Sequence, residues 1–188
     1  MAEKDYIDPQ QLLTYSFKLG IKIFESGYKP NYIIGIWRGG APVGIAVQEL
    51  LDYLGVTTDH ISIRTSSYSG ITQRSNVRVH GLEYIIKNIN SEDSLLIVDD
   101  VFDTGFSIEQ IFTELKIKCR KNTPEIKVAT IFFKPKRNQT TRTPDFYLLE
   151  TDKWIVFPHE LKDLTVAEIQ NEKRGIHSIK EKLLELKK

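Results

Sequence analysis

The order of hydrophobic and polar positions predicts strands that alternate with helices. Apolar runs of strand length occur in NYIIGIW, HISIRTSS, SLLIVDD and EIKVATIFFK, at residues 31–37, 60–67, 94–100 and 125–134. Before and between these runs, apolar side chains recur at helical spacing in residues 12–21, 43–54 and 108–115. Because helices join parallel strands in this way, we expect an α/β fold with a mainly parallel sheet.

The two ends of the chain carry weaker signals. Asp8 and Pro9 suit the N-cap and first position of a helix, and Gly27 is suited to end it. Further short apolar runs of strand type are VRVHG, DFYLLE and WIVFP, at residues 77–81, 145–150 and 154–158. From Val166 onward the chain is charged and helical. We interpret this tail as a surface or packing helix, with an oligomer contact as the alternative.

Composition restricts the class of protein. The chain has 188 residues, 40% of them hydrophobic and 27% charged, which is ordinary for one soluble globular domain. A net charge of +1 gives no electrostatic reason to expect nucleic acid or a membrane surface as partner. No stretch approaches the roughly 18 apolar residues of a membrane span, and the N-terminus has no apolar signal core. We therefore expect a cytoplasmic protein.

Cysteine and histidine offer little chemistry. Cys119 is the only cysteine, so no disulfide can form within the chain, and we expect a structural thiol. His60, His80 and His177 show no metal-ligand spacing.

The most informative stretch is LLIVDDVFDTGFS, residues 95–107, in which an apolar strand runs into carboxylates. Asp99 and Asp100 are expected at the end of the strand, and Asp103 in the turn that follows. Alternation along a strand predicts that the first two side chains point to opposite sides. Adjacent buried carboxylates are costly unless something binds them. Since ligands of open parallel sheets bind beyond the carboxyl ends of the strands, we expect hydroxyls or a metal ion here.

The same stretch is suited to a phosphate. Thr104, Gly105 and Ser107 supply hydroxyls and a permissive backbone directly before a predicted helix. The free N–H groups and the dipole at a helix N-terminus bind phosphate well. A phosphorylated sugar carries both the hydroxyls and the phosphate that this loop would bind. A capped helix after a strand uses similar residues, but the combined pattern is more specific.

The stretch resembles the ribose-phosphate signature of type I phosphoribosyltransferases, which bind 5-phosphoribosyl-1-pyrophosphate (PRPP). IWRGG at residues 36–40 resembles their pyrophosphate loop, and SSYSGITQR at residues 66–74 resembles their mobile loop. Two further segments resemble the purine-recognition segments of the 6-oxopurine branch, IFFKP at residues 131–135 and WIVFPHE at residues 154–160. The likeness is strongest to bacterial xanthine-guanine and archaeal hypoxanthine-guanine enzymes. It spans about residues 33–160.

The resemblance implies the type I phosphoribosyltransferase fold, a Rossmann-like, mainly parallel sheet flanked by helices with a small hood formed by terminal segments. Residues 1–188 would be a single domain. Its parts would be a core of about residues 31–135, a hood from about residues 1–28 and 136–165, and a helical tail of residues 166–188.

The resemblance also implies roles in the donor site. Asp99 and Asp100 would hold the ribose hydroxyls, directly or through Mg²⁺, and Asp103 would take the purine proton. The 5′-phosphate would be bound by Asp103, Thr104, Gly105, Phe106 and Ser107. The pyrophosphate would be bound by Arg38, Gly39, Gly40, Ser66, Ser67 and Tyr68. Glycines let backbone N–H groups approach an anion, and an arginine can pair with its oxygens. Glu160 matches an acidic position linked to a second magnesium site.

The resemblance also implies roles in the site that would bind the purine base. Lys134 would donate to a purine 6-oxo group, which argues against adenine. Trp154 would stack on the base, and Ile155 and Val156 would present backbone groups to its edge. Val156 also stands where xanthine-guanine relatives carry an acid, which favours hypoxanthine, with guanine second. His159 replaces a tryptophan of those relatives, and we interpret it as a surface or packing residue.

We therefore expect a purine salvage enzyme that converts a 6-oxopurine and PRPP into a nucleoside monophosphate and pyrophosphate with Mg²⁺. Relatives are usually dimers or tetramers, so the resemblance implies a homo-oligomer. The alternatives are a xanthine-guanine enzyme, an enzyme for adenine or a pyrimidine, and a non-catalytic regulator that binds PRPP or a nucleotide. A net charge of +1 and the absence of a recognisable DNA-binding segment disfavour the regulator.

Overall fold

A computed structural model describes residues 3–68 and 76–187 of the chain. Its backbone contacts divide the chain into two compact units, Tyr15–Asp152 and the combination of Met1–Thr14 with Lys153–Lys188. That residues 1–188 form a single domain stays a prediction. No helix in the described ranges is long and apolar enough to cross a membrane.

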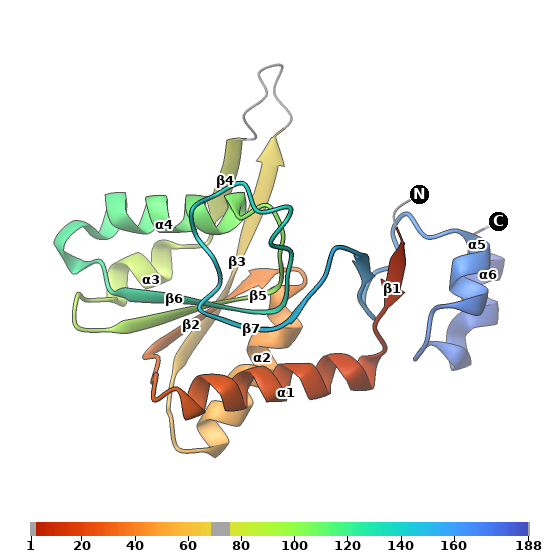
Figure 1. The fold of residues 1–188 in the computed structure, drawn as a ribbon, viewed down its shortest axis with the longest axis horizontal. Helices are drawn as coiled ribbons and strands as arrows, with labels where there is room; N and C mark the ends of the chain where they lie inside the picture. Colours follow the sequence, from red (N-terminus) through yellow and green to blue (C-terminus); the bar gives the residue numbers. More distant parts are fainter. Residues whose placement is uncertain (1–2, 69–75, 188) are drawn as a thin grey trace. The chain divides into compact units, whose positions relative to one another are not determined.

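The larger unit is built on a six-stranded sheet of order β4-β3-β2-β5-β6-β7 (Figure 1). Its strands are β2 (Tyr32–Trp37), β3 (Asp59–Tyr68), β4 (Asn76–His80), β5 (Ser94–Phe102), β6 (Glu125–Phe133) and β7 (Phe146–Glu150). β3 and β4 pair antiparallel, and the other neighbours are parallel. The predicted α/β fold with a mainly parallel sheet is confirmed.

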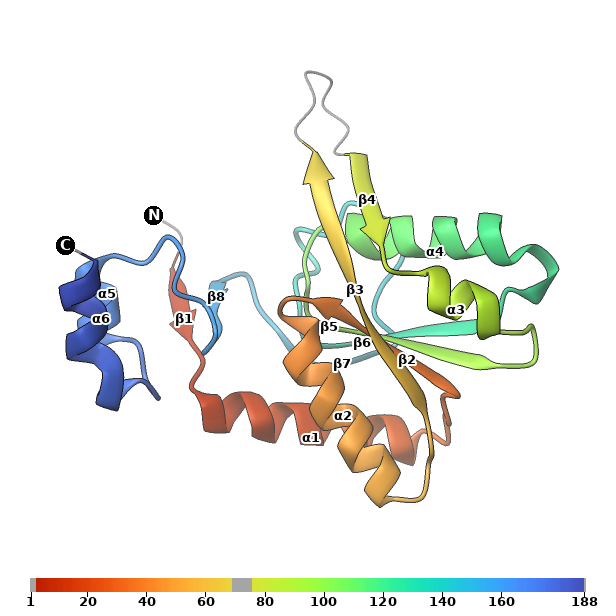
Figure 2. The same ribbon diagram turned by 180° about the vertical axis from the view of Figure 1, so that it is seen from behind.

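Helices cover both faces of this sheet (Figures 1 and 2). They are α1 (Pro9–Glu25), of which the part from Tyr15 belongs to this unit, α2 (Gly40–Tyr53), α3 (Glu83–Asn88) and α4 (Phe106–Cys119), which is followed by the 3₁₀ helix η1 (Arg120–Asn122). The two views show α3 and α4 on one face of the sheet and α2 on the other. Apolar side chains of α3 and α4 form one core cluster with those of the central strands. Leu95 to Val98 are fully buried, so the strand that leads into the aspartates is anchored in the core.

Local signals at both ends of α1 act as predicted. The Asp8 carboxylate accepts a hydrogen bond from the Gln11 backbone N–H at 2.7 Å, which is an N-cap contact. The helix ends at Glu25, and Gly27 follows with a φ of +79°, a left-handed conformation that glycine adopts without strain.

The smaller unit joins the two ends of the chain. β1 (Lys4–Tyr6) pairs in parallel with β8 (Trp154–Val156), and the helices α5 (Val166–Asn171), η2 (His177–Ile179) and α6 (Lys180–Leu186) follow. Its core consists of Val156, Leu164 and Ile169, with Tyr6, Ile176, Leu183 and Leu184 packed against it. The C-terminal tail is therefore a packing segment, as predicted, and it packs on the strand that carries the predicted base-binding residues.

Glu168 connects the N-terminal strand to α5. Its carboxylate accepts hydrogen bonds from Lys4 at 2.5 Å and Tyr6 at 2.8 Å. With Thr165 it forms a capping box at the start of α5. The hydrogen bond from Lys4, followed by those from Thr165 and Tyr6, lowers the pKa of Glu168 from 4.5 to about 2. A lowered pKa means that the folded state favours the charged carboxylate.

We expect Glu168→Gln to lower the urea midpoint of unfolding at pH 7. Because the folded-state pKa is depressed, the wild-type advantage is complete above pH 4.5 and decreases as the pH falls toward about 2. Circular dichroism during urea titration at several pH values measures the difference. Glu172→Gln, at the exposed residue directly after α5, is the control, and a difference that does not change with pH would contradict the assignment.

Candidate active site

β5 positions the aspartate pair differently from the sequence prediction. The strand continues to Phe102, so the prediction that it ends at Asp99 and Asp100 is wrong. Pairing between β2 and β5 stops at Gly35 and Val98, so β2 does not pair with the backbone beyond that point. There the Asp100 N–H donates to the Asp99 carboxylate at 3.0 Å, and the Val101 N–H donates to the Asp100 carboxylate at 2.8 Å. The carboxylates thus fold back onto their own strand.

Both carboxylates lie against the turn that starts α2. A Cβ added to Gly39 would stand 1.7 Å from Asp100 Oδ2, and one added to Gly40 would stand 3.0 Å from Asp99 Oδ1. Both side chains face this same turn, so the prediction that alternation separates them is wrong. The structure therefore brings the predicted pyrophosphate loop and the predicted ribose-binding carboxylates together at one place, where only glycine fits.

The aspartate pair is electrostatically costly without a ligand. Burial, and next the charge of Asp100, raise the pKa of Asp99 well above its ordinary value. A divalent cation or hydroxyl donors would relieve this cost, so the pair fits Mg²⁺. No group of three or more His, Cys, Asp or Glu side chains suited to a metal occurs in the described part of the chain. A magnesium ion here would thus take its remaining oxygen ligands from substrate or water.

Asp103 lies next to two basic side chains. Its carboxylate is 2.8 Å from Arg137 Nε and 4.0 Å from Lys134 Nζ. Lys134 is 3% exposed, and burial is the main cause that lowers the pKa of its ammonium group. Lys134 was predicted from the sequence, whereas Arg137 was not. The basic run from Lys134 to Arg137 could have indicated it, because the Arg137 N–H donates to the Lys134 carbonyl in a turn that directs both toward the aspartate.

The turn between β5 and α4 forms a small polar cavity of about 70 Å³. Its lining includes Asp99, Asp103, Thr104, Gly105 and Ser107, so most of the predicted phosphate-binding residues lie together. Gly105 has a φ of +83° and directly precedes the first residue of α4, Phe106. The cavity therefore opens at a helix N-terminus, which favours an anion.

A segment that was predicted only as part of the hood holds this turn in place. The Gln139 N–H donates to the Thr104 carbonyl at 3.0 Å, and Arg142 pairs with Glu109 of α4 at 2.7 Å. A Cβ on Gly105 would stand 2.5 Å from Thr140 Oγ1. Residues 138–142 therefore pack closely on the phosphate turn, a contact between segments distant in sequence that no local pattern indicates.

The remaining predicted pyrophosphate residues are only partly described. Arg38 is exposed directly after β2, and the peptide before it is cis. Ser66 lies on β3, where its hydroxyl is 3.3 Å from the imidazole of His80. Ser67 and Tyr68 end β3, but their side chains, like residues 69–75, lie outside the described part of the structure. Their binding roles stay predictions.

The predicted base-binding residues of WIVFPHE lie in the smaller unit. Trp154 is half-exposed, whereas Ile155 and Val156 are buried. The Val156 carbonyl already accepts a hydrogen bond from the Ile7 N–H at 3.0 Å. The Glu160 carboxylate accepts from a backbone N–H in its own turn, and its role as a metal ligand stays a prediction.

His159, in the same segment, stacks its ring on that of Phe157 with centroids 5.8 Å apart. This contact agrees with the packing role predicted for it.

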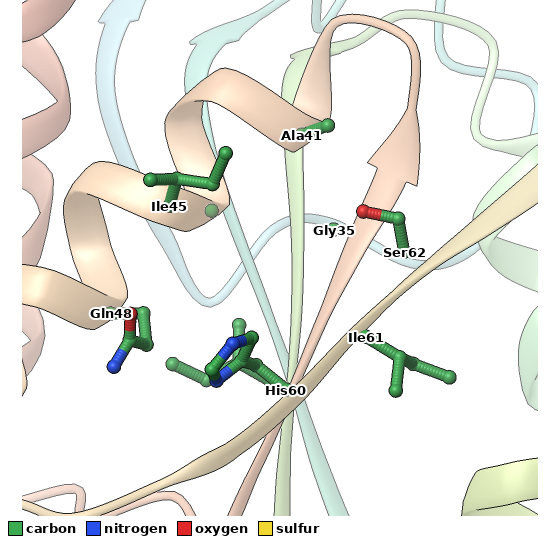
Figure 3. A pocket seen from close by; sticks show the side chains of 9 residues that line it. Gly35, Ala41, Ile45, Gln48, His60, Ile61 and Ser62 are labelled. Carbon is green, nitrogen blue, oxygen red and sulfur yellow. The ribbon is translucent and has the colours of Figure 1, made fainter.

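A larger cavity of about 250 Å³ lies on the face of the sheet that α2 covers (Figure 3). Ile45 and Gln48 of α2 and His60 and Ser62 of β3 line it. None of these residues belongs to the predicted site. The larger of the two cavities is therefore not the candidate active site. The aspartates, the basic pair Lys134 and Arg137, and the phosphate turn indicate the smaller one.

Comparisons with known proteins agree with this geometry. The family model of the phosphoribosyl transferase domain matches residues 10–164. The chain is similar to the solved structure of a purine phosphoribosyltransferase from Pyrococcus horikoshii Ot3, with 32% identity and a TM-score of 0.65, covering 86% of this chain and 97% of that chain. No curated protein sequence gave a significant match.

Two further solved structures share the fold at lower identity. A hypothetical protein from Neisseria gonorrhoeae with bound ppGpp has 20% identity and a TM-score of 0.72, covering 87% of this chain and 92% of that chain. The Helicobacter pylori xanthine-guanine-hypoxanthine phosphoribosyltransferase has 19% identity and a TM-score of 0.65, covering 82% and 92%. These two show the fold alone, whereas the family match and the Pyrococcus relative show that the chain belongs to the type I phosphoribosyltransferase family, in its purine branch.

Proposed function

We propose that the protein transfers the 5-phosphoribosyl group of PRPP to a 6-oxopurine, hypoxanthine first and guanine second, with release of pyrophosphate. The main support for this proposal is the environment of the Asp103 side chain. This carboxylate is paired with Arg137 and lies near the buried Lys134, and it continues directly into a phosphate-sized turn at a helix N-terminus. A proton acceptor, a donor for an oxo group and an anion site thus occur within one unit.

The donor would bind along the turns at the ends of β2 and β5. Arg38 and the backbone N–H groups of Gly39 and Gly40 would hold the pyrophosphate. Asp99 and Asp100 would hold the ribose hydroxyls, directly or through Mg²⁺. When bound, magnesium supplies positive charge that stabilises the departing pyrophosphate. The fit of the aspartate pair to a cation supports this role.

The 5′-phosphate would occupy the cavity before α4. Backbone N–H groups from Thr104 to Ser107 would donate to its oxygens, assisted by the helix dipole. The packing of residues 138–142 on this turn supports a rigid site, because these contacts restrict the movement of the turn.

In the reaction, a purine ring nitrogen attacks the anomeric carbon of the ribose. The carbon–nitrogen bond forms, the carbon–oxygen bond to pyrophosphate breaks, and the proton at purine N7 moves to Asp103. Lys134 donates a hydrogen bond to the 6-oxo group. The amino group of adenine at that position has no acceptor to offer, so the site would reject it. Stacking of Trp154 and backbone contacts from Ile155 and Val156 are further parts of the proposal.

Steady-state kinetics with PRPP, Mg²⁺ and each of hypoxanthine, guanine, xanthine and adenine tests the proposal by pyrophosphate release. We expect the order hypoxanthine, guanine, xanthine, with adenine last. Preference for adenine would show that the role of Lys134 is wrong. If none of the oxopurines caused release of pyrophosphate, the nucleotide-binding regulator would be favoured instead. Light scattering on the same sample tests the proposed homo-oligomer, a dimer or a tetramer.

Lys134→Met is expected to reduce kcat/KM for hypoxanthine roughly 10- to 100-fold, since a charged hydrogen-bond donor to the base is lost. The loss for adenine should be smaller, so discrimination between the two bases decreases. Lys136→Met is the matched control, because Lys136 is exposed in the same basic run and pairs with Asp152. An equal loss for both bases would contradict recognition of the oxo group.

A further inference from the structure

Lys173 is an unusual residue of the smaller unit. It follows α5 and is 2% exposed, whereas lysine side chains are seldom buried unless their ammonium group has a partner. Its Nζ donates a hydrogen bond to the Phe157 carbonyl. An apolar side chain would be cheaper to bury at such a place than a cation, so packing alone does not explain a lysine there.

Both backbone polar groups of Phe157, its N–H and its carbonyl, are hydrogen-bonded. Its N–H donates to the Glu160 carboxylate at 3.2 Å. Its carbonyl accepts from the Glu160 N–H at 3.0 Å as well as from Lys173. Phe157 is itself 2% exposed and directly follows β8. Few conformations remain open to the chain at the end of this strand.

The charges of this arrangement compensate each other. Burial lowers the pKa of Lys173, and the negative charge of Glu160 opposes that effect. The carboxylate of Glu160 binds one side of the Phe157 peptide, and the ammonium of Lys173 binds the other. A buried ammonium and a carboxylate that bind the two peptide groups on either side of the same Cα hold that residue more firmly than solvated side chains would.

We propose that Lys173 is a positioning residue for base recognition. It fixes the Phe157 peptide, and with it the end of the strand from which Trp154 and the backbone of Ile155 and Val156 would contact the purine. The inference rests on the proposed function and extends it, because it gives the C-terminal segment a part in substrate binding. The nearest sequence signal, a lysine in a charged helical tail, does not distinguish this residue from its exposed neighbours.

Lys173→Met tests the proposal, with Lys180→Met as the matched control. Lys180 also donates to a backbone carbonyl, that of Gln170 at 2.8 Å, but it is only partly buried. We expect Lys173→Met to raise the KM for hypoxanthine about tenfold while the KM for PRPP changes less than about twofold, because only base binding loses its support. Lys180→Met should change neither. An unchanged KM for hypoxanthine, or an equal rise of both constants, would overturn the proposal.

Hydrogen–deuterium exchange provides a readout that needs no activity. In Lys173→Met the amides of residues 155–157, 159 and 160 should exchange faster than in the wild type, while those of β5 keep their rates. If the methionine variant does not fold, Lys173→Arg and Lys173→Gln replace it. The arginine, a charged donor, should then retain the lower KM for hypoxanthine, and the opposite order would overturn the proposal.

The same pair of measurements separates the two hypotheses. A wild-type protein that releases no pyrophosphate would refute the proposed function and the role in base binding, and the exchange rates would still show whether Lys173 holds the segment. Active wild-type protein with unchanged exchange and unchanged KM in Lys173→Met would refute the inference alone.

Discussion

Asp103→Asn is expected to lower the turnover of phosphoribosyl transfer by roughly 10²-fold or more. Asparagine keeps the size of the side chain and one oxygen near Lys134 and Arg137, but its amide cannot accept the proton that leaves purine N7. The position is suited to this role because the carboxylate lies 2.8 Å from Arg137 and lines the phosphate turn. Pyrophosphate release under saturating PRPP and hypoxanthine measures the effect.

Binding of the donor separates a chemical role of Asp103 from a structural one. Calorimetric titration with PRPP and Mg²⁺ should give similar affinities for the variant and the wild type, because the backbone of the turn, and not this carboxylate, would hold the phosphate. Asp152→Asn, which removes an exposed aspartate paired with Lys136, is the control for loss of an ion pair. Near-normal turnover of Asp103→Asn would remove this residue from the mechanism.

The local parts of the site could be predicted from the sequence, because strand, turn and helix signals are contained in short segments. Residues 95–107 form β5 from its second residue onward, a turn and the start of α4, in the expected order. The predicted end of the strand was wrong. No local sequence signal shows that the carboxylates of Asp99 and Asp100 accept hydrogen bonds from backbone N–H groups of their own strand. The same contacts turn both carboxylates toward one glycine turn, against the alternation that a regular strand predicts.

Contacts between distant segments could not be predicted in the same way. Arg137 reaches Asp103 through a turn after β6, and residues 138–142 pack on the phosphate turn. β1 and α3 were also missed, since the sequence KDY of β1 contains no apolar run and a helix of six residues is too short to show a hydrophobic period. In each case the fold, and not the local sequence, determines the structure.

Gly40→Ala is expected to damage the donor site as severely as loss of Asp103, but through the backbone. A Cβ on Gly40 would stand 2.4 Å from the Val98 carbonyl oxygen and 2.8 Å from Asp99 Cα. These are backbone atoms of a strand that is fully buried at Val98, so the turn itself must move. Overpacking of this kind costs about 1–3 kcal/mol of folding free energy. Displacing the turn from the two aspartates by about 1 Å would cost roughly 10²-fold in kcat/KM for PRPP.

Two other glycines make this prediction specific. Gly44→Ala, one helical turn later in α2, is the matched control, because its Cβ would meet nothing closer than Gly35 Cα at 3.4 Å. A Cβ on Gly39 would meet the side chain of Asp100, which can rotate, so Gly39→Ala should raise the KM for PRPP with less loss of stability. Urea unfolding and PRPP kinetics on the three variants measure both effects. If Gly40→Ala matched Gly44→Ala in kcat/KM, the turn would not be part of the donor site, and the pyrophosphate would have to bind elsewhere.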